Sequence, residues 1–562
     1  MHTDSDLQRT KSEDNSGRRA RCVSVPSRFA PVRQTRHIRS NGAILDRSIG
    51  VASRTIYASR AQSNHRLGIP RRKRPLTFVA ISFVAAIAVV LVLQATMQGT
   101  DRAGTMQGPG EWGTPTLVEN DDGTVWIGLD VEHDSAGNAI AVWNQRNGTD
   151  WPIFSNRYVK GVGWEAPEMI SDADFGNSNY PRVSVNSSGN AVCVWQQESR
   201  VTRHYSILAN WYVVGAGWGT PSLVEFNETG NTSGPDVFTL PDGGAVAVWE
   251  GDAPGSNYSV WANRYGSSGW GTPELLETEA GGITQIQVAS NPSGDGIAVW
   301  SQTNGTYYHI WAARYYALSG WEVAELVEED AATYAFYPKP ALDSNGNAIV
   351  VWSASETGYD HIWANRYEVG KGWGNATRLE KESSLHASYP GVAVDSDGNA
   401  IAVFTLRLAY AHVQTSRYVV GTGWGDPVPI ENNPYDVLDP IIDFDSLGNA
   451  ICAWCQITDT PSGIFSIWVN RYDASAGWGT ARSIGNTGTG NAYDPRVSCD
   501  PSGNAIVVWR QGIDTSTTRF DLWANTYEAP VIPEFSVVIT PIVSIIAVAV
   551  LVSFSHRRKR ED

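Results

Sequence analysis

The segment GNAIVVW, from Gly346 to Trp352, returns in eight versions along this chain of 562 residues. Each version begins with Gly, continues through a short aliphatic run and ends in Trp or Phe, and successive versions start 50 to 55 residues apart. A regular period of this length indicates one supersecondary unit that is copied and stacked. The versions begin at Gly137, Gly189, Gly243, Gly294, Gly346, Gly398, Gly448 and Gly503.

One repeat unit, residues 337–380, contains four short β-rich runs separated by turn signals, which predicts a four-stranded antiparallel meander. The first run is expected to begin directly after a Pro such as Pro338, where the missing N–H does no harm. The second run is apolar on both faces, so it must be covered on both sides. The fourth run opens with Gly-Trp, as at Trp373, and large side chains opposite small ones suit packed twisted sheets. Such blades around an axis form a β-propeller.

The two ends of the repeat array indicate how the ring closes. The eighth unit ends its third run at Tyr527 without a following Gly-Trp run, whereas an extra run, residues 111–119, precedes the first complete unit. Pairing these ends within one blade leaves no open sheet edge. The sequence therefore predicts an all-β fold over residues 111–528: an eight-bladed β-propeller of four-stranded antiparallel blades, closed by an N-terminal strand.

A D-x-x-G-N turn joins the first and second runs in most units. An Asp or Asn side chain closes such a turn on nearby backbone N–H groups, and Gly suits a positive φ. Only the turn at Asp395 carries a second acid, Asp397, and resembles a calcium loop, so a turn without metal is favoured and neither a metal site nor a cofactor is predicted. Structural turn roles are expected for Asp134, Gly137, Gly189, Gly243, Gly294, Asp343, Gly346, Asp395, Gly398, Asp445, Gly448, Asp500 and Gly503.

The D-S-x-G-N-A-x-x-V-W pattern, as in DSAGNAIAVW from Asp134 to Trp143, resembles the Asp-box hairpin of sialidase-type propellers and, more loosely, the turn of NHL-like repeats. The resemblance covers residues 109–528 and implies architecture only, because such hairpins stabilise blades and catalyse nothing. A sialidase would also need an Arg-Ile-Pro segment, which the sequence lacks. Structural pairing is therefore expected for the Arg that returns in the third run: Arg157, Arg264, Arg314, Arg366, Arg417 and Arg471.

Charge is distributed unevenly along the chain. Residues 101–532 hold 21 basic and 50 acidic side chains, a net charge of −29, whereas residues 1–74 and 556–562 are basic. A body with this charge repels nucleic acid, so no nucleic-acid partner is expected. Residues 1–74 are expected to be a disordered tail, because they are polar and lack apolar periodicity.

Two uncharged apolar stretches, residues 75–97 and 537–555, border the basic ends, and each is long enough to span a bilayer. The positive-inside rule places both basic ends in the cytoplasm and the propeller outside, joined by linkers at 98–110 and 529–536. A cleaved signal sequence is an open alternative for residues 75–97. The expected location is therefore the cell membrane, with the propeller facing outside.

The segment Pro533, Glu534, Phe535, followed by an apolar stretch and a basic tail, resembles the PEF-CTERM sorting signal of archaeal surface proteins. The resemblance implies an archaeosortase as a partner and replacement of the apolar helix by a lipid anchor. A plain C-terminal transmembrane anchor is the alternative.

The variable residues of the repeat units are expected on one face of the ring. In a meander the first and third connections share one face, which carries the repeated turns, and the second and fourth connections share the other. Aromatic rings beside carboxylates suit sugar rings, although such aromatics could equally cover the blade tops. The ligand candidates are Tyr180, His204, Tyr205, Tyr258, Tyr308, His309, Tyr337, Asp360, His361, Tyr389, Asp436, Asp439 and Asp494.

These observations favour a membrane-tethered cell-surface propeller that binds a glycan or protein ligand through its outward variable loops, without catalysis. One alternative is an extracellular carbohydrate-active hydrolase or lyase with carboxylates at the propeller mouth. The acids come from different blades, however, so spacing identifies no catalytic pair and the question of enzymatic activity stays open. A purely structural surface-layer protein is the other alternative.

Overall fold

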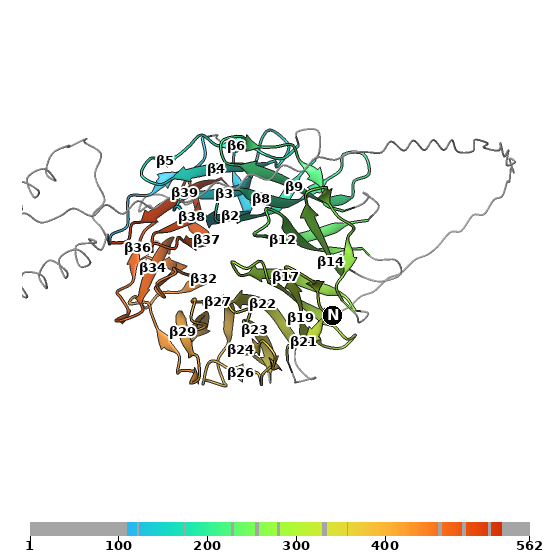
Figure 1. Cartoon of the computed structure of the whole chain (residues 1–562). Helices are drawn as coiled ribbons and strands as arrows, with labels where there is room; N and C mark the ends of the chain where they lie inside the picture. The colour runs from blue at the N-terminus through green and yellow to red at the C-terminus, as the bar shows by residue number, and fades with distance from the viewer. Residues whose placement is uncertain are drawn as a thin grey trace, which may run out of the picture. The chain divides into compact units, whose positions relative to one another are not determined.

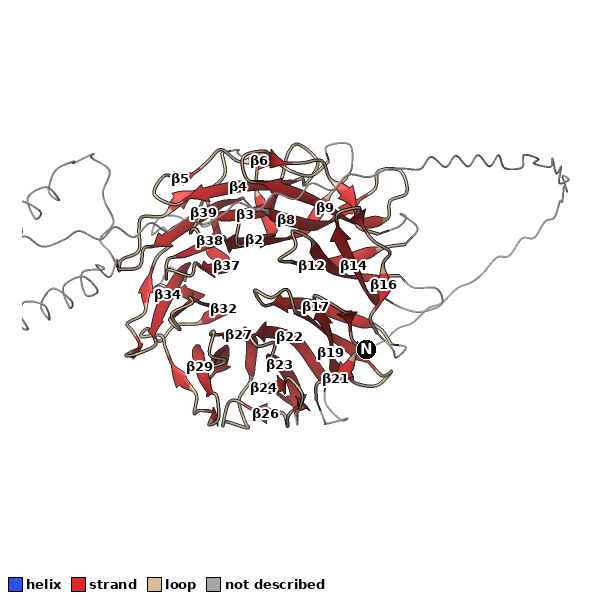
Figure 2. Cartoon of the chain, in the orientation of Figure 1, coloured by secondary structure: helices blue, strands red, loops and turns tan. Residues whose placement is uncertain are grey.

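Eight antiparallel sheets surround a central axis in the structure, a computed structural model, which confirms the predicted eight-bladed propeller (Figure 1). The described part of the chain consists of strands, turns and loops (Figure 2), and no helix in it could span a membrane. The apolar stretches 75–97 and 537–555 and the residues Pro533, Glu534 and Phe535 lie outside the described residues. The structure describes residues 110–530 except 121–122, 173–175, 226–229, 253–257, 278–280, 329–333, 357, 459–462, 486–489 and 515–518.

Seven blades are continuous in sequence, and we number them by chain order. From the axis outward, blades 1 to 4 are β2 (Val125–His133), β3 (Ala139–Gln145), β4 (Ile153–Val159), β5 (Gly163–Trp164); β7 (Ser178–Val185), β8 (Ala191–Glu198), β9 (Tyr205–Val213), β10 (Gly217–Trp218); β12 (Thr232–Thr239), β13 (Ala245–Gly251), β14 (Ser259–Gly266), β15 (Gly269–Trp270); and β17 (Ile283–Ser290), β18 (Gly296–Thr303), β19 (Tyr308–Tyr316), β20 (Gly320–Trp321). Blades 5 to 7 are β22 (Tyr334–Leu342), β23 (Ala348–Glu356), β24 (Tyr359–Glu368), β25 (Gly372–Trp373); β27 (Ala387–Val394), β28 (Ala400–Arg407), β29 (Ala411–Val419), β30 (Gly423–Trp424); and β32 (Val437–Phe444), β33 (Ala450–Ile457), β34 (Phe465–Asp473), β35 (Gly477–Trp478).

The outermost strand of these blades is broken into two short pieces, both paired with the third strand. The second pieces are β6 (Glu168–Met169), β11 (Ser222–Leu223), β16 (Glu274–Leu275), β21 (Glu325–Leu326), β26 (Thr377–Arg378), β31 (Val428–Pro429) and β36 (Arg482–Ser483).

Blade 8 joins the two ends of the array. Its strands β37 (Ala492–Cys499), β38 (Ala505–Gly512) and β39 (Phe520–Tyr527) are completed by β1 (Thr116–Leu117), in which Thr116 pairs with Ala524. Trp112 adds a bridge to Tyr527. Inner strands β37 and β2 lie in contact, so the ring is closed as predicted.

The second strand of each blade forms the core. Trp143 of β3 is fully buried, and its indole N–H donates to Gln145 Oε1 at 2.8 Å, so the large ring leaves no unpaired donor. The same Trp-x-Gln bond occurs in blades 2, 4, 7 and 8. Each such Trp packs into a cluster with residues of a neighbouring blade, which explains why the aliphatic run is apolar on both faces.

Buried Asn residues of the third strand connect neighbouring blades. Asn263 Nδ2 donates to Val224 O of blade 2 at 2.7 Å and to Gly271 O of its own blade at 3.2 Å. The repeated Arg also reaches the next blade, as in Arg314, whose guanidinium lies 3.7 Å from the ring centre of Tyr367. Equivalent Asn bonds come from Asn156, Asn210, Asn365, Asn470 and Asn525.

The D-x-x-G-N turns form a ring on one face. Asp134 Oδ1 accepts from Ala136 N at 2.9 Å and from Asn138 N at 2.8 Å. Gly137 has φ of 84°, and a Cβ there would lie 2.5 Å from Asp500 Oδ2 of the neighbouring blade. Glycine is therefore required both by the backbone and by the adjacent carboxylate. The same interblade approach occurs at Gly189, Gly398 and Gly503.

The inner strands extend further than the sequence predicts. Strand β7 begins at Ser178, before Pro181, and its pairing register shifts between Asn179 and Arg182. The strand continues past a β-bulge because the bulge absorbs the missing Pro N–H. The expectation that the first run begins after the Pro was wrong, and five of the ligand candidates lie in inner strands rather than in loops: Tyr180, Tyr337, Tyr389, Asp439 and Asp494.

Candidate functional site

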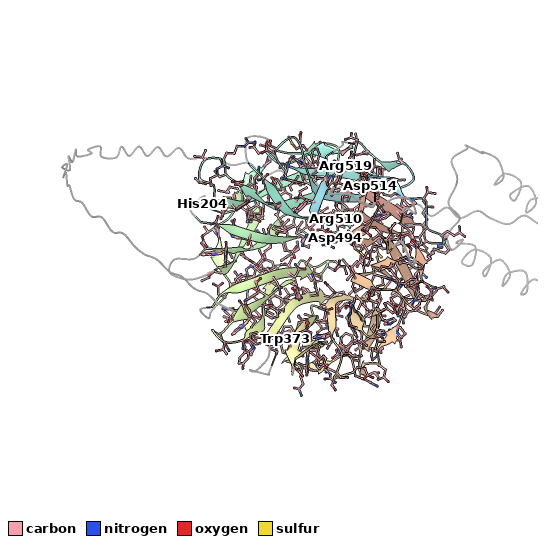
Figure 3. The ribbon with its side chains drawn as sticks, turned by 180° about the vertical axis from the view of Figure 1, so that it is seen from behind. His204, Trp373, Asp494, Arg510, Asp514 and Arg519 are labelled. Carbon is pink, nitrogen blue, oxygen red and sulfur yellow. The ribbon has the colours of Figure 1, made fainter. Side chains whose placement is uncertain are left out.

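A cavity of about 460 Å³ lies on the propeller axis, where the inner strands bulge. Four sequence-predicted candidates line it: Tyr337, Tyr389, Asp439 and Asp494. Figure 3 shows Asp494 close to the centre of the ring, whereas Trp373 lies at its rim. The axial cavity therefore brings together residues from blades that are far apart in sequence.

The bulge residues adopt a backbone conformation that normally favours glycine. Tyr337 has φ of 56° and Tyr389 has φ of 53°, and both side chains are largely exposed. An L-residue in this region carries about 1–3 kcal/mol of strain, whereas Gly carries none. Blade 3 has a Gly at the equivalent position, Gly234 with φ of 54°. The other strained bulge residues are Tyr180, Gln285, Asp439 and Asp494.

A second ring of side chains lies two residues beyond each bulge. It includes three cations, Arg182, Lys339 and Arg496, all of which line the cavity. Lys339 Nζ donates to Gln287 Oε1 at 2.6 Å. Burial, followed by the charges of Arg496 and Arg182, lowers the pKa of Lys339 to about 8. The equivalent residue of blade 6 is Gly391, which adds no side chain to the cavity.

Two acids of this second ring hold the neighbouring blade. Asp130 Oδ2 accepts from Val183 N at 3.1 Å, and Asp236 Oδ2 accepts from Val288 N at 2.9 Å. Burial raises the pKa of Asp236. These carboxylates therefore satisfy N–H groups on the exposed edges of inner strands as well as facing the cavity.

A third ring continues the same pattern deeper along the axis. Glu132 Oε2 accepts from Val185 N at 2.8 Å, and Asp443 Oδ2 accepts from Cys499 N at 2.7 Å. Burial raises the pKa of Glu132 to about 8 and that of Asp443 to about 7. His133, beside them, is buried, and burial lowers its pKa to about 4. At neutral pH this third ring therefore carries less charge than its number of titratable side chains suggests.

One side of the cavity mouth is acidic. Asp439 and Asp494 occupy bulge positions in blades 7 and 8, and Asp494 is ion-paired with Arg510. The two labelled side chains of this pair lie together in Figure 3. Burial, followed by the charge of Asp494, raises the pKa of Asp439. The mouth thus presents tyrosines from blades 5 and 6 beside carboxylates from blades 7 and 8.

Other candidates lie away from the axial cavity. His309 and His361 are buried, and their Nδ1 atoms each lie 2.7 Å from a glutamate oxygen, of Glu328 and Glu380 respectively. Tyr205 lines a separate cavity. Tyr180 is an exception, because it occupies the bulge of blade 2 at the mouth although it does not line the cavity itself. The remaining candidates are placed as follows: His204 before β9, Tyr258 exposed before β14, Tyr308 against Phe336, Asp360 beside His386, and Asp436 accepting from Ala411 N.

Sequence reasoning missed the cations of the second ring, Arg182, Lys339 and Arg496. A signal for them exists, because each stands two residues after the bulge and pairs with the same position of the second strand. It also missed Trp126 and Trp151, which line the second cavity.

The calcium-like turn uses its first acid internally. Asp395 Oδ1 accepts from Asp397 N at 3.0 Å and from Asn399 N at 2.8 Å, and Asp397 is exposed. Within the described residues, no group of three or more His, Cys, Asp or Glu side chains is arranged to hold a metal ion.

No family model and no curated protein matches the sequence. Among solved structures, a BP39L lectin from Burkholderia pseudomallei is similar with a TM-score of 0.43 at 11% identity, over 63% of this chain and 98% of the lectin. A PL25 ulvan lyase has a TM-score of 0.41 at 10% identity, over 67% and 94%. A protein of unknown function from Dyadobacter fermentans has a TM-score of 0.38 at 11% identity, over 75% and 99%. Similarity at this level assigns no function to this chain.

Proposed function

We propose that this propeller recognises a glycan in the axial cavity. The observation that carries the proposal is the set of strained, exposed tyrosines at the bulges, Tyr180, Tyr337 and Tyr389, in a backbone conformation that glycine adopts without strain. A side chain kept at a position where it opposes stability points to a role outside folding. Strain of this kind gathers at ligand-binding sites.

The chemistry of the cavity suits a saccharide. Tyr337 and Tyr389 line the cavity and offer aromatic faces to the apolar side of a sugar ring. Lys339 supplies N–H donors, and Asp439 supplies acceptors for hydroxyl groups. An apolar wall with a few converging polar groups is the usual composition of a small-ligand site.

The proposal includes a membrane tether with the cavity mouth facing outward. Gly110 N donates to Glu528 O, and Ala529 N donates to Asn504 Oδ1 in the turn of blade 8, so both ends of the described segment lie beside the repeated turns. If residues 75–97 and 537–555 anchor the chain, the repeated turns face the membrane. The thiol of Tyr410→Cys, between β28 and β29, should be labelled rapidly on intact cells. Protection of this thiol from the label contradicts this orientation.

Binding by full-length protein to an array of neutral and acidic oligosaccharides tests the function. Tyr389→Gly is expected to weaken binding about tenfold, because one stacking face is lost. Tyr410→Gly is the matched control, since Tyr410 is as exposed as Tyr389, at 48%, but does not line the cavity. Equal affinities of both variants and the wild type contradict an axial site.

Hydrolysis of the bound glycan is a second candidate function. Burial, followed by the charge of Asp494, raises the pKa of Asp439, which favours its acid form relative to an ordinary aspartate, and the ion-paired Asp494 supplies a second carboxyl group at the mouth. Release of reducing ends by the wild type and its loss in Asp439→Asn support catalysis. Binding without any release of reducing ends leaves recognition as the function.

A further inference from the structure

We propose that a second cavity, between blades 1 and 2, is a separate sugar-stacking subsite; the inference rests on the proposed glycan recognition. This cavity of about 320 Å³ is lined by Trp126, Trp151, Asn177, Asn179 and Tyr205. It shares no lining residue with the axial cavity. We call it the tryptophan pocket.

The two indoles form an angled aromatic surface. The rings of Trp126 and Trp151 lie 5.5 Å apart between centres, at an angle of 58°. Trp126 is 48% exposed, whereas the repeated Trp residues of the second strands are fully buried. An exposed indole that does not pack into the core leaves its face open to the apolar side of a pyranose ring.

A local insertion produces this exposure. Val125 pairs with Gln145 and Asp130 with Val142, so five steps along β2 match three along β3. In β7, four steps from Ser178 to Arg182 match three, and the other inner strands also take four steps. The additional residue therefore belongs to blade 1, where the enlarged bulge carries Trp126. The fold itself does not require this residue, since the other seven blades form the same sheet without it.

Polar groups suited to sugar hydroxyls line the same pocket. Asn144 Nδ2 donates to Asn179 Oδ1 at 3.3 Å, which fixes the amide of Asn179 at the wall. Asn177 Nδ2 donates to Glu198, whereas the buried Asn177 Oδ1 has no hydrogen-bond partner among the described residues. An unsatisfied acceptor of this kind costs stability in the free protein, so its place at the pocket wall is not explained by folding.

The tryptophan pocket lies next to the axial mouth. Asn179 lines the pocket, the following residue Tyr180 stands at the mouth, and Arg182 lines the axial cavity, all on β7. Burial, then Glu198 and Tyr180, raises the pKa of Tyr205, so the phenols of Tyr180 and Tyr205 are within electrostatic reach. One extended oligosaccharide can therefore occupy both cavities, with a ring on the indoles and its neighbours toward the axis.

Titration of full-length protein with hexasaccharides of glucose, mannose, N-acetylglucosamine and galacturonic acid tests this inference. Trp126→Ala is expected to weaken hexasaccharide binding by roughly 3- to 10-fold, the range that one aromatic contact supplies. Tyr410→Ala, which removes an equally exposed aromatic outside both cavities, is expected to bind as the wild type does. Ligand should also shift the fluorescence of the wild type to shorter wavelength more than that of Trp126→Phe.

The outcomes separate this inference from the proposed function. Loss of binding in Tyr389→Gly with no change in Trp126→Ala overturns the second subsite and leaves the axial site. Loss in Trp126→Ala with no change in Tyr389→Gly supports the tryptophan pocket and overturns the axial site. A Trp126-dependent fluorescence shift with a proline-rich peptide and none with any hexasaccharide assigns the pocket to protein partners and overturns the inference.

Discussion

Both faces of the propeller contain positions that need a positive φ, but different residue types occupy these positions. On the repeated face, the D-x-x-G-N turns need a positive φ, and Gly occupies the position in every blade, as at Gly137 and Gly398. At the axial mouth the bulges also need a positive φ, but Tyr or Asp occupies the position in five blades, as at Tyr389 and Asp494. The repeated face follows backbone preference, whereas the mouth departs from it. A Tyr or Asp at a position where Gly would avoid backbone strain therefore marks a side chain with a role beyond folding.

The largest effect is expected on the repeated face. Asp395→Ala removes the acceptor of two backbone N–H groups and of Asn399 Nδ2, and should lower the free energy of unfolding by about 3 kcal/mol. Asp397→Ala, in the same turn but exposed, should change it by less than about 0.5 kcal/mol. Urea unfolding of both variants measures the difference, and equal destabilisation would break the distinction between turn acid and surface acid.

At the mouth, stability and binding should separate. Tyr337→Gly relieves strain but adds freedom to the unfolded chain, so we expect the free energy of unfolding to change by no more than about 1 kcal/mol. Oligosaccharide affinity should fall about tenfold in the same variant. Parallel calorimetric unfolding and binding titrations measure both quantities. A large loss of stability would show that Tyr337 serves the scaffold, as the turn residues do.

A smaller effect on the free energy of unfolding is expected from the third ring of side chains as pH changes. Glu132 has a folded pKa of about 8 against an ordinary 4.5, so the native state binds more protons and stability falls as pH rises between these values. His133, with a pKa of about 4 against 6.5, acts in the opposite sense, but only below pH 6.5. Unfolding free energies from pH 6.5 to 8 should therefore decline in the wild type and less so in Glu132→Gln. Parallel declines in both proteins would exclude Glu132 as the cause.

The smallest effect is expected from calcium. Because Asp395 already bonds its own turn and Asp397 is solvent-exposed, millimolar Ca²⁺ or a chelator should leave the melting temperature unchanged. A calcium-dependent rise that disappears in Asp397→Ala would contradict this expectation and assign a metal to the repeated face.

The repeat predicted the scaffold because its chemistry is local and recurs. The conformation of each Gly-Asn turn and the packing of each Trp-rich run depend on only a few neighbouring residues. The missing fourth strand of the last unit predicted the closure by Thr116 and Leu117. The axial site was only partly predictable. Tyr337 and Asp494 could be singled out by type, but their strained bulges follow from the register between strands, which composition does not reveal. Trp126 was missed because a one-residue insertion is hidden until the pairing of β2 and β3 is known.

The closure of the ring within blade 8 has a mechanical consequence. Trp112 bridges Tyr527, so the two ends of the described chain leave side by side from one sheet. A pull on both ends loads the short contact between β1 and β39 first and peels it bond by bond, while the other seven blades carry no tension until that contact opens. The pairing of β1 with β39 is thus the weakest part of the propeller under such a pull, and its rupture would turn the closed ring into an open spiral.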